Sequence, residues 1–199
     1  VQEALTAHGK RVGPRFLPKV LGNLAAAQVA IAHHITGPTM TVNTACSSGA
    51  DAIILGAMLL KTGEADSVLV LGGESGVNPL MIGSLSKAMA LSRRNDDPTG
   101  ASRPFDLNRD GFVMGEGGGA VVLELESHAR ARGAKIYGEL AGYANTSDAY
   151  HVTAPNPSGA GAAQCMERAI AMSGLDKSAI GYINAHGTAT HAGDIAETN

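Results

Sequence analysis

The sequence predicts an α/β fold built from two related halves, and three observations lead to that prediction. Runs rich in β-branched residues alternate with alanine-rich, helix-like runs along most of the 199 residues. Glycine supplies 26 residues without a collagen-like period, which indicates tight turns between elements. In each half a buried strand ends in a turn of small polar residues, the place where α/β proteins carry their sites.

The first half, residues 1–133, is expected to contain these elements in order: helix 20–33, strand 39–45, helix 48–62, strand 67–73, strand 120–126 and helix 127–133. The helix over 48–62 is apolar almost all round, which predicts burial, and Gly63 would end it. Strand, tight turn, helix and strand make a βαβ unit, which predicts that strand 67–73 is a buried parallel strand. Cys46 lies in the first turn of this unit.

The second half, residues 134–199, is expected to repeat the pattern with strand 135–145, helix 159–174 and strand 179–185. The helix places Ala162, Met166, Ala169 and Ile170 on one face. A boundary between the halves is expected near Gly133, because a helix closes there and a new strand pattern follows.

Charge and composition exclude several classes of function. The formal net charge of −3 argues against a general binder of nucleic acid or of membrane surfaces. No uninterrupted apolar run reaches the length of a membrane span, and the first residues lack the apolar core of a signal peptide. The two cysteines suit a reducing compartment, so we expect a cytoplasmic protein. There is no initiator methionine, and both ends read as internal to a longer protein.

Cys46 is a candidate nucleophile because of where it lies. A side chain in the turn between a buried strand and a buried helix points at the open end of the sheet. The N-terminus of a helix stabilises a thiolate, and exposed N–H groups there can hold an oxyanion. Composition alone leaves open whether Cys46 is this nucleophile or a buried core residue. Cys165, inside the second predicted helix, has no such setting and is interpreted as structural.

His186 occupies the matching position in the second half, directly after the predicted strand 179–185. A cysteine and a histidine at strand ends of one α/β protein indicate acyl transfer through a thioester. No metal is expected, because His186 and His191 stand five residues apart without a cluster of zinc-ligand spacing. The stretch GEGGGA (115–120) resembles a dinucleotide-binding turn but precedes a strand rather than a helix, so no nucleotide cofactor is expected.

Several motifs in order resemble the β-ketoacyl-acyl-carrier-protein synthases, nearest to the chain-elongating type II fatty-acid branch: NTACSSGADAI, ALSRRNDDP, ASRPFDLNRDGFVMGEGGGAVVLELESHARARGAKIYGEL, SDAYHVTAPNPSGAGAA and YINAHGTATHAGDIAE. The resemblance runs from about Gly13 to the last residue. It implies a thiolase-like fold of duplicated αβαβα layers, incomplete at both ends here, in a homodimer. Polyketide relatives usually show a third serine after the cysteine and EAHGTGT, and chain-length-factor relatives replace the cysteine.

The resemblance also implies roles. Cys46 would receive an acyl group from acyl-carrier protein, and His186 would stabilise the enolate formed when malonyl-carrier protein loses CO₂. Thr188 and Thr190 would hydrogen-bond the phosphopantetheine arm that carries the substrates, with no further cofactor. The loop PRFLP (14–18) resembles a segment that lines the neighbouring subunit's acyl pocket, with Phe16 and Leu17 as candidates. Lys10 and Arg11, in a locally basic stretch, match a region where the family docks its acidic carrier protein.

Two departures from the family pattern matter. Relatives usually carry proline where His191 stands. The family's lysine, its second catalytic histidine and a Gly-Phe turn would lie beyond Asn199, so the isolated segment is expected to be inactive. Three alternatives stay open: a polyketide-type ketosynthase, a thiolase-like acyltransferase, and a non-catalytic fragment of the same fold.

Overall fold

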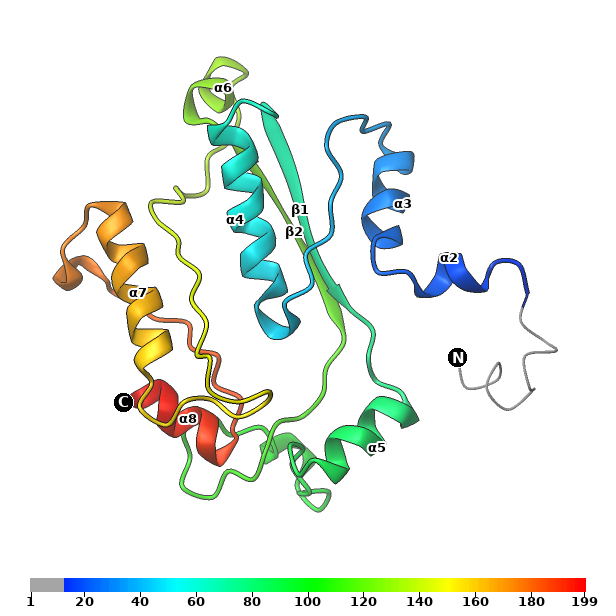
Figure 1. Ribbon diagram of the computed structural model, residues 1–199, viewed down its shortest axis with the longest axis vertical. Helices are drawn as coiled ribbons and strands as arrows, with labels where there is room; N and C mark the ends of the chain where they lie inside the picture. Colours follow the sequence, from blue (N-terminus) through cyan, green and yellow to red (C-terminus); the bar gives the residue numbers. More distant parts are fainter. Residues whose placement is uncertain (1–12) are drawn as a thin grey trace. The chain divides into compact units, whose positions relative to one another are not determined.

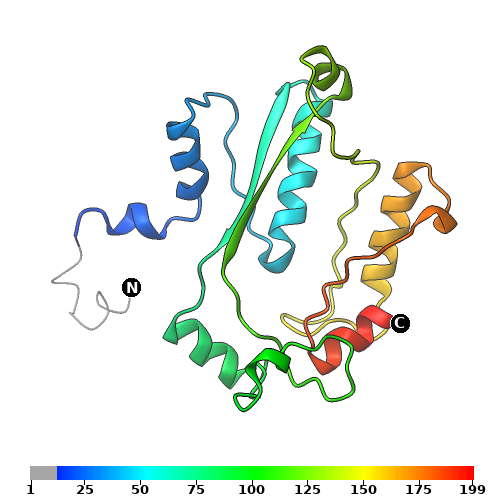
Figure 2. The same ribbon diagram turned by 180° about the vertical axis from the view of Figure 1, so that it is seen from behind.

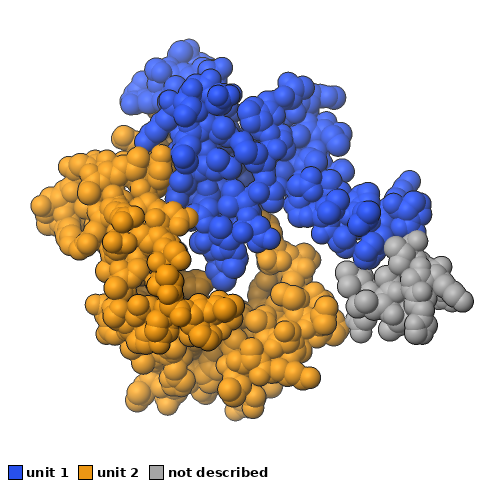
Figure 3. All heavy atoms as spheres, viewed as in Figure 1, with its two compact units in different colours: residues 1–72, 120–133 blue, residues 73–119, 134–199 orange. Residues whose placement is uncertain are grey.

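The structure, a computed structural model, describes residues 13–199, which divide into two compact units (Figure 3). The first unit holds the described residues up to 72 together with 120–133, and the second holds 73–119 together with 134–199. These units interleave along the sequence and are not the same division as the two sequence halves, whose boundary near Gly133 stays a prediction. The units are therefore described one at a time.

The described part of the first unit has two short helices in place of the single helix predicted over 20–33 (Figure 1). α2 spans Phe16–Val20 and α3 spans Leu24–Ala32. The break falls at Leu21, whose φ of −73° and ψ of 125° are extended, so the helical hydrogen-bond pattern stops there. Gly22, a poor helix former, follows directly.

α4 spans Ser48–Lys61 and confirms the helix predicted over 48–62. Gly63 follows with a φ of +76°, the left-handed conformation in which its N–H closes the last turn on the carbonyl oxygen of Leu60 at 3.2 Å. Fewer residues of α4 are buried than predicted: only Gly56, Ala57 and Leu60. The prediction that this helix is buried all round was wrong for the described chain.

The strands β1 (Ser67–Glu74) and β2 (Gly117–Glu124) form a two-stranded sheet. They run in opposite directions (Figure 1), so Gly73 near the end of β1 lies beside Gly117 at the start of β2. The predicted parallel arrangement of 67–73 is therefore corrected: its partner in the described structure is an antiparallel strand.

Gly56 lets α4 approach this sheet closely. A Cβ atom at this position would lie 3.1 Å from Val70 and Leu123 side-chain carbons and 3.3 Å from one of Val68. These distances are tighter than ordinary van der Waals contact, so a larger residue would push the helix away from the sheet. After β2 the short helix α6 (Glu126–Ala131) follows, and Gly133, with a φ of +69°, ends it as predicted.

Three predicted strands are not strands in the described structure: 39–45, 135–145 and 179–185. Their composition suits a strand, yet a strand persists only where a neighbour satisfies its N–H and C=O groups. None of the three has such a ladder among residues 13–199, so they run as irregular chain (Figure 2).

The second unit contains three α-helices in its described part: α5 (Pro79–Lys87), α7 (Ala160–Ser173) and α8 (His191–Thr198). α7 confirms the helix predicted over 159–174. Gly159 precedes it with a φ of +66° and Gly174 ends it with a φ of +70°, so glycine serves at both ends where an L side chain would be strained.

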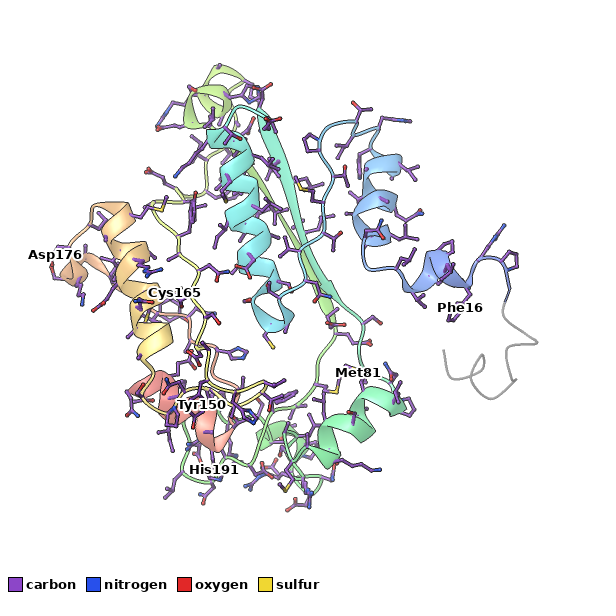
Figure 4. All side chains as sticks on the ribbon, in the orientation of Figure 1. Phe16, Met81, Tyr150, Cys165, Asp176 and His191 are labelled. Carbon is purple, nitrogen blue, oxygen red and sulfur yellow. The ribbon has the colours of Figure 1, made fainter. Side chains whose placement is uncertain are left out.

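Small residues form the half-buried face of α7, at Gly161, Cys165, Ala169 and Ser173. The Cys165 thiol donates to the carbonyl oxygen of Ala144 at 3.3 Å, and the Thr146 hydroxyl donates to that of Gly161 at 2.8 Å (Figure 4). Of the four residues predicted to share a face, Ala169 and Ile170 are half-buried, whereas Ala162 and Met166 are exposed. The chain before α7 packs along the helix instead of pairing as a strand.

α8 packs beside the start of α7 within the second unit (Figures 1 and 2). The Asn199 side-chain amide donates to the carbonyl oxygen of Pro157 at 3.0 Å. A Cβ at Gly159 would collide with the carbonyl oxygen of Ala196, so glycine is required at this crossing as well. None of the helices in residues 13–199 is long and apolar enough to cross a bilayer.

Candidate active site

Cys46 lies in a short 3₁₀ turn, Ala45–Ser47, immediately before α4, and its side chain is exposed. Ala45 has a φ of +52°, the left-handed region that residues with a Cβ rarely adopt. Such strain persists only where the surroundings impose it, and it gathers at functional sites. The thiol therefore stands at the N-terminus of a helix, on a turn held in an unfavourable conformation.

Asp51, in the first turn of α4, holds this turn from one side. The hydroxyl groups of Thr44 and Ser47 both donate to its carboxylate, the latter at 2.9 Å. From the other side, the Ser48 hydroxyl accepts from the Thr44 N–H at 2.9 Å and donates to the Ala45 carbonyl oxygen at 2.7 Å. The small polar residues around Cys46 thus fix the backbone rather than fill a core.

His186 lies in the second unit, on a turn with two left-handed residues. Gly187 has a φ of +52° and Ala189 a φ of +62°. These two left-handed residues alternate along the chain with Thr188 and Thr190. As a result, the hydroxyl oxygens of the two threonines lie 2.9 Å apart. Thr190 also accepts from the Gly193 N–H at 3.1 Å as the N-cap of α8. Because the pair shares one hydrogen, a second hydroxyl hydrogen remains to donate to a bound molecule.

Two carboxylates of α8 hold this turn by its backbone. Glu197 accepts from the N–H groups of His186 and Gly187, the latter at 2.8 Å. Asp194 accepts from the Ala189 N–H at 3.0 Å and from the Phe105 N–H at 2.6 Å. Hydrogen bonds to ionised acceptors are about twice as strong as neutral ones, so α8 sets the path of the turn.

Arg109 compensates the charge of Asp194. Its Nε lies 3.2 Å from the Asp194 carboxylate, and the two side chains are only 10% and 2% exposed. The guanidinium also donates to the carbonyl oxygens of Thr190 at 3.3 Å, His191 at 3.1 Å and Asp106 at 2.9 Å. The buried Asp194 carboxylate is thus paired with a cation that is itself hydrogen-bonded, so neither charge is left without a partner in the interior.

The segment that carries Arg109 is itself anchored through Asp110. The Ser92 hydroxyl donates to this carboxylate at 2.6 Å and the Arg93 N–H at 3.0 Å. These two hydrogen bonds, the Ser92 bond first, lower the pKa of Asp110 below its ordinary value. The neighbouring Gly111 N–H donates to the Ala189 carbonyl oxygen at 3.0 Å, which joins the segment to the His186 turn.

The structure brings three of the residues predicted for the site into one turn: His186, Thr188 and Thr190. Cys46 belongs to the first unit, as do Leu17 and Phe16 of α2; Figure 4 labels Phe16. Phe16 is half-buried and Leu17 is exposed. Lys10 and Arg11 lie outside the described residues. No group of three or more His, Cys, Asp or Glu side chains within residues 13–199 is arranged to hold a metal ion.

The residues that hold both turns were missed from the sequence: Asp51, Arg109, Asp194 and Glu197. Asp51 had a signal, because an acidic residue in the first turn of a helix stabilises its N-terminus. Asp194 and Glu197 are three apart on α8 and share a face, a spacing visible in HAGDIAE. Nothing local marks Arg109, whose partner Asp194 lies far along the chain.

Comparison with known families decides the assignment. Residues 2–129 match the family described as "Beta-ketoacyl synthase, N-terminal domain", and residues 137–199 match "Beta-ketoacyl synthase, C-terminal domain". The chain belongs to the beta-ketoacyl synthase family. The resemblance carried by the motifs around Cys46 and His186 is thereby confirmed.

Curated relatives agree. The chain is 45% identical over 196 residues to 3-oxoacyl-acyl-carrier-protein synthase 2 of Vibrio cholerae, covering 98% of this chain and 47% of the relative. It is 50% identical over 187 residues to the protein of the same name from Rhizobium meliloti, covering 94% and 44%. The chain thus spans less than half the length of these relatives.

Solved structures of ketosynthases have the same fold. A beta-ketoacyl synthase from Burkholderia phymatum superposes with a TM-score of 0.92 at 34% identity, covering 99% of this chain and 48% of that one. A ketosynthase of a type II polyketide synthase, solved with its acyl-carrier protein and a bound hexaketide, gives 0.91 at 36% identity, covering 94% and 46%. The predicted α/β class is confirmed, and the fold is part of a thiolase-like ketosynthase fold.

Proposed function

We propose that the protein catalyses a decarboxylative Claisen condensation that lengthens a fatty acyl chain by two carbons. The Cys46 thiolate attacks the carbonyl carbon of the acyl thioester, and the carrier sulfur leaves as a thiolate that takes up a proton from water. Malonyl thioester then loses CO₂, and the resulting enolate attacks the acyl carbonyl carbon on Cys46. Collapse of that adduct expels the Cys46 thiolate and leaves a 3-oxoacyl thioester on the carrier. The identity to 3-oxoacyl-acyl-carrier-protein synthases, with an exposed Cys46 at a helix N-terminus, carries this proposal.

His186 would stabilise the enolate oxygen that appears on decarboxylation. A group held in place before the reaction acts on charge present only in the transition state. The grip of Glu197 on the backbone of His186 and Gly187 supports such a fixed position. The free hydroxyl hydrogen of the Thr188–Thr190 pair would serve the phosphopantetheine arm, and no other cofactor is proposed.

The proposed partner is an acyl-carrier protein. A structural relative was solved in complex with its own acyl-carrier protein, which supports this choice. Lys10 and Arg11 would dock this partner, and Phe16 and Leu17 would line the acyl pocket of the other subunit in a homodimer. Reversing both charges at Lys10 and Arg11 should raise the KM for carrier-bound substrate, more at low salt, and leave turnover of a small pantetheine thioester unchanged. A loss shared equally by the small thioester would refute the docking role.

The two sequence halves, 1–133 and 134–199, would be parts of the N- and C-terminal ketosynthase halves. One family match ends at residue 129 and the other begins at residue 137, on either side of this boundary.

A cytoplasmic location is proposed because both cysteines are free, as in a reducing compartment. An Arabidopsis thaliana relative at 47% identity is named as chloroplastic, so fractionation of the native cells is the direct test.

A polyketide-type ketosynthase is the second candidate, favoured by the structural relative with a bound hexaketide. The sequence NTACSSGADA has no third serine after Cys46, which favours the fatty-acid reading. Incubation of the intact protein with malonyl-carrier protein and either a saturated acyl or a 3-oxoacyl primer distinguishes the two. Preference for the saturated primer supports fatty-acid elongation, and preference for the 3-oxoacyl primer supports the polyketide reading.

The two half-reactions test the roles of the residues. In the intact protein that contains this chain, His186→Ala should slow malonyl decarboxylation by about 10²-fold and affect acyl loading onto Cys46 less. Equal losses in both half-reactions would make His186 a general base for the cysteine instead. Absence of condensation by the intact wild-type protein would overturn the proposed function.

A further inference from the structure

Ala189, in the His186 turn, adopts a conformation that its own side chain disfavours. Its φ is +62° and it is only 1% exposed. An L-residue with a Cβ in this region is strained, so neighbouring groups must hold it there. Two hydrogen bonds do so: the Ala189 N–H donates to Asp194 at 3.0 Å, and its carbonyl oxygen accepts from the Gly111 N–H at 3.0 Å.

The first of these bonds depends on Arg109. Asp194 is 2% exposed, and the Arg109 guanidinium is its partner in an ion pair of 3.2 Å. Without that cation the carboxylate would be a buried, uncompensated charge, so it would move toward water or draw water in. Either response weakens its acceptance of the Ala189 N–H.

Arg109 also holds the end of the same turn directly. It donates to the carbonyl oxygens of Thr190 and His191, where the turn enters α8, and to that of Asp106 in its own loop. Lysine can supply the charge but not this planar fork of donors. One side chain thus ties the 104–111 loop to both the middle and the end of the His186 turn.

We propose that Arg109 is a positioning residue, which acts through Asp194 to hold Ala189 left-handed and so aims His186 and the Thr188–Thr190 hydroxyl pair. The inference rests on the proposed function for what those groups do, and on the contacts above for how they are held. Cys46 belongs to the other unit, and none of these contacts involves it.

The test compares Arg109→Met and Arg109→Lys in the intact protein with Arg130→Met. Arg130 is an exposed arginine on α6 that also forms an ion pair with a carboxylate, that of Glu126 at 2.7 Å, so it is a matched control. Arg109→Met should slow malonyl decarboxylation by between about tenfold and about 10²-fold. Loading of acyl groups onto Cys46 should stay within about twofold, and Arg109→Lys should lie between wild type and Arg109→Met.

Ala189→Gly supplies the decisive measurement, because glycine adopts a positive φ without strain. Alone it should change decarboxylation little; combined with Arg109→Met it should restore part of the lost rate. Urea unfolding of the same variants separates this recovery from a gain in overall stability, because relief of strain at Ala189 also stabilises the fold. Unchanged decarboxylation in Arg109→Met, or no recovery in the double variant, would overturn the proposal.

Hydrogen exchange separates this proposal from the proposed function. The Ala189 amide should exchange faster in Arg109→Met than in Arg130→Met or wild type, whether or not the protein condenses malonyl thioesters. Equal exchange in all three proteins would refute the positioning role. If the wild type does not condense malonyl thioesters but the exchange difference at Ala189 is found, only the proposed function is refuted.

Discussion

Glu197 accepts hydrogen bonds from the backbone N–H groups of His186 and Gly187, eleven and ten residues before it. The contact is made to the peptide groups rather than to the imidazole. It therefore fixes the direction in which the His186 side chain leaves the backbone, without competing for the ring nitrogens. Of the two α8 carboxylates that hold this turn, Glu197 is therefore the one that acts on the backbone of the candidate catalytic histidine itself.

Glu197→Gln should weaken this grip. An amide presents one acceptor oxygen where the carboxylate presented two, and its NH₂ group would face an N–H donor. We expect malonyl decarboxylation to fall by about tenfold and the free energy of unfolding to fall by about 1 kcal/mol. Steady-state decarboxylation and urea unfolding measure the two effects.

The matched control is Glu167→Gln on α7. Glu167 is an exposed carboxylate in an ion pair with Lys177 at 3.4 Å, so its loss should change neither quantity measurably. Equal effects of the two substitutions would show that Glu197 contributes charge to the surface and nothing specific to His186.

Much of the fold was predictable because local signals coincide with it. α4 and α7 begin and end almost where the sequence predicts, since apolar helical runs there are bounded by residues such as Gly63 and Gly174. The segment 179–185 has an equally clear strand composition, yet it forms no ladder among the described residues. Helical hydrogen bonds are local, whereas a strand depends on a neighbour that the sequence does not name.

The candidate site likewise contains residues that local sequence patterns mark and residues that they do not. Cys46 and His186 stand out because each follows an apolar run and enters a turn of small residues. The groups that hold the His186 turn come from elsewhere: Phe105 and Asp194, which share a hydrogen bond, are 89 residues apart. No local pattern predicts such a pairing, so the candidate residues Cys46 and His186 were accessible from the sequence, whereas the long-range partners of Asp194 were not.

The two cysteines should behave differently. Cys46→Ala should abolish acyl transfer in the intact protein, because no other exposed thiol in the described structure can carry the acyl group. Cys165→Ala loses one weak hydrogen bond to Ala144 and should cost about 1 kcal/mol of stability or less, with acyl transfer retained. Mass spectrometry after incubation with acyl-carrier protein locates the adduct. An acyl group on Cys165 or on a serine would contradict this assignment.

Stability should depend on pH through Glu124, at the end of β2. Arg132 hydrogen-bonds its carboxylate at 2.6 and 2.7 Å, and His128 does so at 2.6 Å. These bonds, that of Arg132 first, lower the pKa of Glu124 from 4.5 to about 2. A carboxyl whose pKa is lower in the folded state stabilises the fold above its unfolded pKa. That contribution should therefore disappear as the pH falls from about 4.5 toward about 2.

Glu124→Gln isolates this dependence. Its free energy of unfolding should be lower than that of the wild type at neutral pH, and the difference should shrink as the solution is acidified through that range. Glu126→Gln, which breaks the exposed pair with Arg130, should show little change at any pH. A constant difference between Glu124→Gln and wild type across the acid range would disprove the linkage.

His191 stands where the resembling family usually carries proline, and the structure explains what proline would do there. His191 is the first residue of α8, the position at which proline is favoured because its fixed φ suits a helix. Thr190 before it is extended, with a φ of −82° and a ψ of 146°, a conformation that a following proline permits. His191→Pro should therefore raise the free energy of unfolding by about 0.4–1 kcal/mol, because it restricts the unfolded chain.

Decarboxylation should be unchanged in His191→Pro. The contact between Arg109 and residue 191 is made to the backbone carbonyl oxygen, which proline keeps. His191→Ala, the control, should give no such gain in urea unfolding; destabilisation by proline would mean that the His191 N–H or its side chain contributes to the turn.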